Sequence, residues 1–312
     1  MYSPYLKGKQ FEFLALRELA SEFTVEEKEK VLPIIEPVKK STRDALTAFK
    51  AMIDADWPFA LVLNPHLGDF QRGGISYYGL VRECLESNIG KWIPAFVLDK
   101  RDDVSRLVSE EGFDTVMAIL PKDEDLDDWA DFLKSDVVRY IVICNADSSS
   151  LLRKVRRLGG EKTLIRLDDC FRAELKNALY AGKEDQFFND NHTVYLDDGL
   201  SGFADYTTLP SRFIEGGVSP TVVAIHMTYF KDADEIRIHH FLSDPKAKSN
   251  EDSPGKFYEA AKQIEPFFAA HPDSVTNDLR KLIQLVSDMH YPGLGSIKKY
   301  SMKHHITLMS RI

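Results

Sequence analysis

The stretch Leu164-Ile165-Arg166-Leu167-Asp168 is a short, mostly apolar run that ends in a carboxylate. The same order recurs along the chain at Pro33–Glu36, Ala60–Asn64, Ala95–Asp99 and Tyr140–Asn145. Parallel strands that are buried on both faces are continuous runs of Val, Ile and Leu, and Asp or Asn after such a run is a common helix cap. The recurrence therefore predicts strands that alternate with helices around a parallel sheet.

The spacing of these runs predicts six regular strand–helix units and two less regular ones. The six strands are expected at about 31–36, 58–64, 92–98, 115–120, 138–144 and 163–168. The seventh strand is either Thr193–Leu196 or Phe203–Thr207, and Thr221–Phe230 is expected as the eighth. This count predicts an α/β fold of the (β/α)₈ TIM-barrel-like type, with a doubly wound open sheet as the alternative.

The C-terminal part of the chain is expected to add elements to this barrel. Residues 235–243 follow the eighth strand closely enough to form an added β-hairpin, and helices are expected near 171–181, 254–270, 274–288 and 298–310. The sequence contains no low-complexity linker. We therefore expect one barrel-like domain over residues 1–312, with the hairpin and the C-terminal helices of residues 235–312 as decoration of the same domain.

The composition limits the class of protein. The 312 residues are 44% hydrophobic with a formal net charge of −9, which predicts a globular fold and disfavours direct binding of nucleic acid. No apolar stretch has the roughly 18 residues that a membrane span needs, and the first residues lack the pattern of a secretory signal. Three widely spaced cysteines do not form a disulfide framework. We therefore expect a cytoplasmic protein without membrane association.

Acidic side chains at the ends of the predicted strands form the first candidate site. The carboxyl ends of barrel strands meet at one rim, where TIM barrels bind their ligands. Oxygen ligands in such a ring suit Mg²⁺ or Mn²⁺, which would activate water against a phosphodiester. Helix capping is the alternative role for each of these residues. The expected metal ligands are Glu36, Asp99, Asp168 and Asp205, with Asp197 as the alternative to Asp205 and with Asn64 and Asn145 on the same rim.

Basic residues and histidines complete this candidate site. Lys39 and Arg101 closely follow Glu36 and Asp99, so they would bind a phosphate or pair with the acidic ring. His226 lies within the expected eighth strand and would act as general acid or base. The adjacent pairs His239–His240 and His304–His305 are expected to be surface or partly buried histidines.

Several strings of the sequence resemble a family of uncharacterised bacterial proteins related to the phage "beta protein" family. The strings include Met1–Glu12, Pro33–Val38, Gly202–Tyr206, Val223–Tyr229, His239–Asp244 and Tyr291–Gly295 with Ser301–His305. They come from both ends of the chain and from its middle. None of them is a catalytic signature.

The resemblance implies a barrel-like fold and a partner. Members of that family are typically encoded beside a protein that resembles PD-(D/E)XK nucleases, as in a defence or toxin–antitoxin pair. The resemblance also favours Asp205 over Asp197, because Asp205 lies in a shared string. Our leading hypothesis is therefore a protein that binds the nuclease-like product of the adjacent gene. The alternative is a metal-dependent phosphoesterase or related hydrolase with its site at the barrel rim, so enzymatic activity stays open.

Overall fold

A computed structural model describes residues 1–71, 77–99, 103–121, 126–144, 149–216 and 219–312 of the chain. These residues form two compact units: residues 1–169 with 193–206, and residues 170–192 with 207–312. The expectation of one domain over the whole chain stays a prediction.

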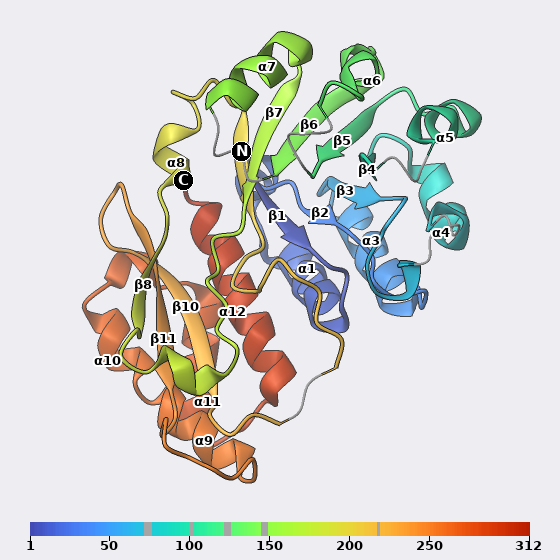
Figure 1. The fold of residues 1–312 in the computed structure, drawn as a ribbon. Helices are drawn as coiled ribbons and strands as arrows, with labels where there is room; N and C mark the ends of the chain where they lie inside the picture. The colour runs from blue at the N-terminus through green and yellow to red at the C-terminus, as the bar shows by residue number, and fades with distance from the viewer. Residues whose placement is uncertain (72–76, 100–102, 122–125, 145–148, 217–218) are drawn as a thin grey trace. The chain divides into compact units, whose positions relative to one another are not determined.

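The first unit contains a closed barrel of parallel strands, which confirms the predicted fold class (Figure 1). The ring closes because β1 pairs with β2 on one side and with β9 on the other. In ring order the strands are β1 (Tyr2–Leu6), β2 (Ile34–Ile35), β3 (Phe59–Val62), β4 (Trp92–Val97), β5 (Val116–Leu120), β6 (Val138–Cys144), β7 (Thr163–Asp168) and β9 (Gly202–Asp205).

Helices connect these strands and lie outside the ring (Figure 1). The longer helices pack an apolar stripe against the strands. In α3 (Arg43–Asp54), for example, Phe49 and Met52 belong to this buried stripe. The helices are α1 (Gln10–Glu22), α2 (Val25–Lys30), α3 (Arg43–Asp54), α4 (Tyr78–Leu85), α5 (Val104–Glu111), α6 (Ala130–Lys134), α7 (Ser149–Gly159) and α8 (Asn191–Val194), with single 3₁₀ turns at Gly68–Phe70 and Glu86–Asn88.

Alternate residues of the strands fill the inside of the barrel. On β7, Ile165 and Leu167 belong to the inner cluster, and on β9 Ala204 does. Side chains one position away therefore face the helices, because successive residues of a strand point to opposite faces. This alternation decides which side chains at the strand ends point toward the inside of the barrel.

The second unit is a three-stranded antiparallel sheet with helices against it. The strand order is β10 (Ala224–Phe230), β11 (Ile236–Leu242) and β8 (Asp185–Asn189). β10 and β11 pair as the predicted hairpin. The other elements are a 3₁₀ turn at Asn177–Tyr180, α9 (Ser253–Ala261), α10 (Ile264–Ala269), a 3₁₀ turn at Pro272–Ser274, α11 (Asn277–Ser287) and α12 (Leu294–Met309).

The core of the second unit includes two histidines that were expected to be at the surface or only partly buried. His304 and His305 on α12 are fully buried rather than at the surface. The Nε2 atom of His304 lies 2.7 Å from the Thr228 carbonyl oxygen, so Nε2 donates, and Nδ1 lies 2.8 Å from Thr276 Oγ1. Burial lowers the pKa of His304 to about 4. The imidazole is therefore a neutral structural link between α12 and the sheet.

Three sequence predictions about the strands need correction. The barrel strand that was not predicted is β1, while Thr221–Phe230 forms β10 of the second unit instead of an eighth barrel strand. The predicted helix near 171–181 is only a 3₁₀ turn, and β8 follows it. Of the two options for the seventh strand, Phe203–Thr207 is the one that matches β9.

No helix in the described part of the chain has the length and apolar character of a membrane span.

Candidate functional site at the carboxyl ends of the barrel strands

The carboxyl ends of β1, β2 and β9 bring together a lysine, a glutamate and two tyrosines. Tyr5 belongs to the inner cluster of the barrel, and Tyr206 packs against that cluster. Their ring centroids are 5.2 Å apart, and the Lys7 Nζ atom lies 4.7 Å from the centroid of the Tyr206 ring. Glu36 lies two residues after Ile34, so its side chain is on the same, inner side of the strand. We call Tyr5, Lys7, Glu36 and Tyr206 the rim cluster.

Glu36 is a buried carboxyl group held in one orientation. Its side chain is only 6% exposed. Tyr5 donates its hydroxyl hydrogen to Glu36 Oε2 at 2.9 Å, and the His66 backbone N–H donates to Oε1 at 3.4 Å. Burial raises the pKa of Glu36, and these two donors with the charge of Lys7 only partly oppose that effect. The carboxyl group thus exchanges its proton nearer to neutral pH than an exposed glutamate does.

Lys7 is the cation that acts on this carboxyl group. It is 5% exposed, and burial lowers its pKa although the carboxylates of Glu12, Glu36 and Asp169 act in the opposite direction. A buried ammonium group is costly unless opposite charges surround it. Lys7 and Glu36 are therefore coupled charges in a dry environment, where electrostatic interactions are stronger than at a surface.

Two further groups share the electrostatic environment of Glu36. Burial raises the pKa of the Cys144 thiol to about 12, and the nearby Glu36 and Asp168 add to this effect. Burial also raises the pKa of Tyr206, with further contributions from Cys144, Glu36 and Asp169. Both groups are neutral near pH 7, so they act as hydrogen-bonding or packing groups and not as nucleophiles.

Asp168 and Asp205 do not join the rim cluster. Each lies one residue from an inward-facing position, Leu167 and Ala204. The Asp168 Oδ2 atom accepts a hydrogen bond from Arg166 Nε at 2.6 Å, and Asp205 Oδ1 accepts one from Tyr2 at 2.7 Å. Their carboxylates therefore form structural pairs on the other face of the strands. Both predicted metal ligands thus make other contacts, and their role in metal binding stays a prediction. The neighbouring Asp169 is exposed, and its charge acts on Lys7 and Tyr206.

The other predicted residues of the β3 and β4 ends have different roles. Asn64 accepts from the Val97 N–H at 2.9 Å and donates to the Val97 carbonyl oxygen at 2.8 Å. Its amide therefore extends the β3–β4 ladder as a backbone group would. Asp99 lies two residues after Val97, which packs against the inner cluster, and Asp99 is partly buried. Asn145 lies outside the described residues.

Of the three residues expected to act in catalysis, only Lys39 belongs to the described part of the barrel unit. Lys39 is half-exposed, and its Nζ lies 3.4 Å from Asp69 Oδ1. His226 belongs to the second unit. Arg101 lies outside the described residues. The rim residue Lys7 was missed because β1 was missed.

The predicted metal site is not assembled from the four carboxylates. Within the described residues, no group of three or more His, Cys, Asp or Glu side chains is placed to hold a metal ion. Glu36 accepts a hydrogen bond from Tyr5, while Asp168 and Asp205 accept hydrogen bonds from Arg166 and Tyr2. A Mg²⁺ or Mn²⁺ ion in the form predicted from the sequence therefore has no complete ligand set among these residues.

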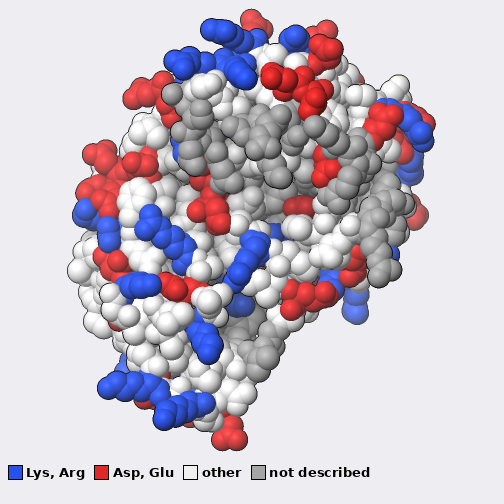
Figure 2. Space-filling model, viewed as in Figure 1, with Lys and Arg blue, Asp and Glu red and all other residues white. Residues whose placement is uncertain are grey.

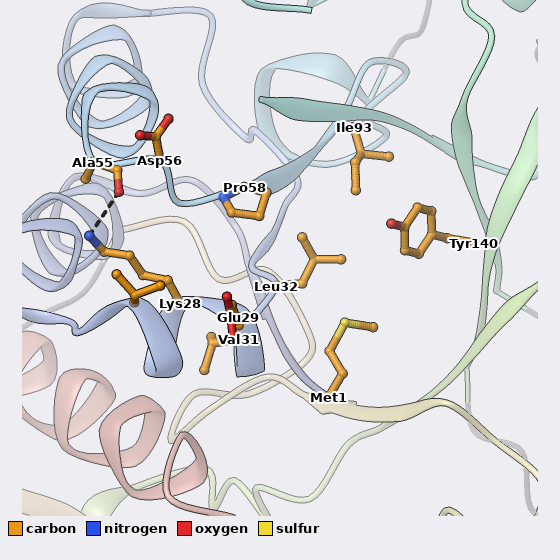
Figure 3. Close-up of a pocket in the computed structure, with 11 residues that line it drawn as sticks. Met1, Lys28, Glu29, Val31, Leu32, Ala55, Asp56, Pro58, Ile93 and Tyr140 are labelled. Atoms are coloured by element: carbon orange, nitrogen blue, oxygen red, sulfur yellow. Dashed lines mark hydrogen bonds between the residues drawn. The ribbon is translucent and has the colours of Figure 1, made fainter. Parts of the chain in front are cut away.

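The opposite end of the barrel strands has a pocket of a different kind. It has a volume of about 410 Å³, and Met1, Leu32, Ile93 and Tyr140 line its apolar part (Figure 3). Its lysine, Lys28, donates to the Ala55 carbonyl oxygen at 2.9 Å. Residues at the amino ends of TIM-barrel strands typically serve stability. The rim cluster is the better candidate for chemistry.

The buried carboxyl group predicts a pH dependence of stability that a Glu36→Gln variant should lose. Below the ordinary pKa of 4.5 the folded and unfolded chains both carry the proton. As pH rises from there through the raised folded pKa, only the unfolded chain releases it, so stability falls. We expect Glu36→Gln to gain stability relative to wild type as pH rises over this window.

Urea unfolding followed by tryptophan fluorescence between about pH 4 and pH 8 measures this difference. The matched control is Glu83→Gln, which makes the same substitution at an exposed position of α4. A Glu36→Gln difference that stays constant over this pH range would contradict the raised pKa of Glu36.

Comparison with known proteins adds no assignment to this site. No protein-family model, no curated protein and no solved structure matches the chain.

Proposed function

We propose that the barrel unit is an enzyme that moves a proton on a small substrate carrying a carboxylate or carbonyl group. The substrate would bind at the carboxyl ends of the barrel strands, the usual location of TIM-barrel active sites. The observation that carries the proposal is the buried pair of Lys7 and Glu36, oriented by Tyr5. Burial raises the pKa of Glu36 and lowers that of Lys7, and neighbouring titratable groups perturbed in this way are typical of catalytic sites.

Each member of the rim cluster has a role in such a reaction. Glu36 accepts a proton from the carbon next to the carbonyl group, and the electron pair of that C–H bond stays on the substrate as an enolate. Lys7 offsets the negative charge that develops on the enolate oxygen. Glu36 then gives the proton to a different carbon of the conjugated enolate, where a new C–H bond forms as the carbonyl group is restored, and the substrate leaves as an isomer. Its raised pKa suits both steps because an acid–base catalyst works best with a pKa near the operating pH.

Calorimetric titration of the full chain with oxalate tests this proposal. Oxalate is a planar dicarboxylate that resembles the enolate of a 2-oxo acid. We expect wild type to bind it and Lys7→Met to bind it at least about tenfold more weakly, because a charge-assisted contact is lost. The exposed Lys50→Met variant on α3 should bind like wild type. Equal affinities for the Lys7 and Lys50 variants, or no binding to wild type, would reject the proposal.

We also propose, as a second function, that the chain binds the nuclease-like product of an adjacent gene. The resemblance described above implies this partner, and the net charge of −9 suits a basic partner surface. On the face seen in Figure 2, acidic and basic side chains are interspersed instead of forming one acidic patch. The partner would therefore recognise a local pattern of charges.

Co-expression with the product of the adjacent gene followed by size-exclusion chromatography tests the second function. We expect one shared elution peak at low salt that splits as salt is raised, because charge-based association is screened. Two separate peaks at every salt concentration would reject this partnership. The rim-cluster proposal does not depend on the result.

A further inference from the structure

A pocket in the second unit has the size and lining of a small-molecule site. Its volume is about 560 Å³, within the range of about 300–1,000 Å³ typical of ligand sites. The pocket is lined by residues from 171–180, 208–214 and 219–220, from the start of β10 and from the first turns of α12. All of these residues belong to the second unit. It is therefore separate from the rim cluster.

His226 in this pocket is held in place while one of its ring nitrogens is left for a ligand. The Nδ1 atoms of His226 and His240 are 2.7 Å apart, so one of them carries the shared hydrogen. The His226 ring also lies 5.0 Å from Phe171 and 5.1 Å from Tyr180, measured between ring centroids. Among the described residues, Nε2 of His226 has no hydrogen-bond partner. This nitrogen is available to a ligand beside two aromatic rings.

The charges that line the pocket favour an anion. Its acidic residue Glu174 is neutralised by Lys183, whose Nζ lies 2.6 Å away. Arg212 and Lys298 also line the pocket and are exposed, and neither has an ion-pair partner within the described ranges. Leu294, the first residue of α12, lies at the same pocket. The positive end of that helix dipole adds to the two cations.

The geometry points to a binding site for a small planar aromatic anion, such as a mononucleotide or an aromatic carboxylic acid. Phe171 and Tyr180 would pack against the planar ring. His226 would hydrogen-bond to a polar atom of the ligand through Nε2. Arg212 and Lys298 would bind its phosphate or carboxylate group.

Calorimetry on the full chain with four probes tests the site. The probes are adenosine 5′-monophosphate, 4-hydroxybenzoate, adenosine and inorganic phosphate. We expect at least one of the two aromatic anions to bind, with adenosine and phosphate at least about tenfold weaker. Tighter binding of adenosine 5′-monophosphate would identify the charged group of the ligand as a phosphate, and tighter binding of 4-hydroxybenzoate would identify it as a carboxylate. His226→Ala and Lys298→Ala should each weaken binding at least about tenfold.

Two controls make the result specific. Lys262→Ala removes an exposed lysine of the same unit that does not line the pocket, and it should bind like wild type. Lys50→Met removes an exposed lysine of the barrel unit and should also bind like wild type. The inference is overturned if neither aromatic anion binds, if phosphate alone binds as tightly, or if Lys298→Ala and Lys262→Ala have equal affinities. Lys298 is exposed, so its variant decides the test even if His226→Ala does not fold.

Discussion

Asp278→Asn is expected to destabilise the second unit by about 3–5 kcal/mol, because it leaves a buried ammonium group without its countercharge. The Lys303 side chain is fully buried and its Nζ lies 2.8 Å from Asp278 Oδ1. Asp278 is itself 2% exposed on the first turn of α11. Lys281 lies 3.7 Å from the same oxygen but is largely exposed, so the ion pair with Lys303 dominates the buried electrostatics.

Hydrogen exchange measured by mass spectrometry on α11 and α12 peptides reports this effect. Tryptophan fluorescence does not, since Trp57, Trp92 and Trp129 all belong to the barrel unit. The matched control is Asp56→Asn, which removes an exposed ion pair with Lys91 and should leave the protection of the α11 and α12 peptides unchanged. Adding Lys303→Met to Asp278→Asn should restore part of the loss. If these peptides were as well protected against exchange in Asp278→Asn as in Asp56→Asn, the buried ion pair would not stabilise the second unit.

Removing residues 2–7 is expected to abolish cooperative folding of the barrel unit. This segment contains β1, which pairs with both β2 and β9 and so closes the ring. Tyr2, Tyr5 and Leu6 on it are at most 5% exposed. The loss of a central strand exceeds the typical net stability of about 5–15 kcal/mol for a domain.

The fluorescence of Trp57 and Trp92 measures this change, because both side chains are buried in the folded barrel unit. Their emission should shift to the red in the truncated chain. A graded test uses Leu6→Ala, expected to cost about 2–5 kcal/mol, against the exposed Leu80→Ala, expected to cost less than about 0.5 kcal/mol. A truncated chain with native tryptophan emission would mean that β1 is dispensable for the barrel.

The sequence predicted most of the barrel because its buried strands are continuous apolar runs. Six of the eight strands, β2 to β7, lie in the expected places. β1 escaped prediction because Tyr2–Leu6 is short and includes Ser3 and Pro4, and its partners are up to about 200 residues away in the chain. β10 was mistaken for a barrel strand because a Val- and Ile-rich run occurs in parallel and antiparallel sheets alike.

The candidate site was harder to predict because one residue decides the face of a strand. Asp168, the last residue of β7, pairs with Arg166, whereas the next residue, Asp169, is exposed and its charge acts on Lys7. For Lys303 the sequence held no signal, since its partner Asp278 lies on another helix. A lysine beside histidines in a helix is typical of an exposed face.

A crystal structure of the full chain with oxalate tests the account most directly. We predict oxalate density within hydrogen-bonding distance of Lys7 Nζ, at the carboxyl ends of the barrel strands, with Glu36 on the same side. The Tyr5 hydroxyl should still donate to Glu36. Oxalate bound only elsewhere, or Lys7 and Glu36 pointing to opposite faces of the strands, would contradict the proposed catalytic site.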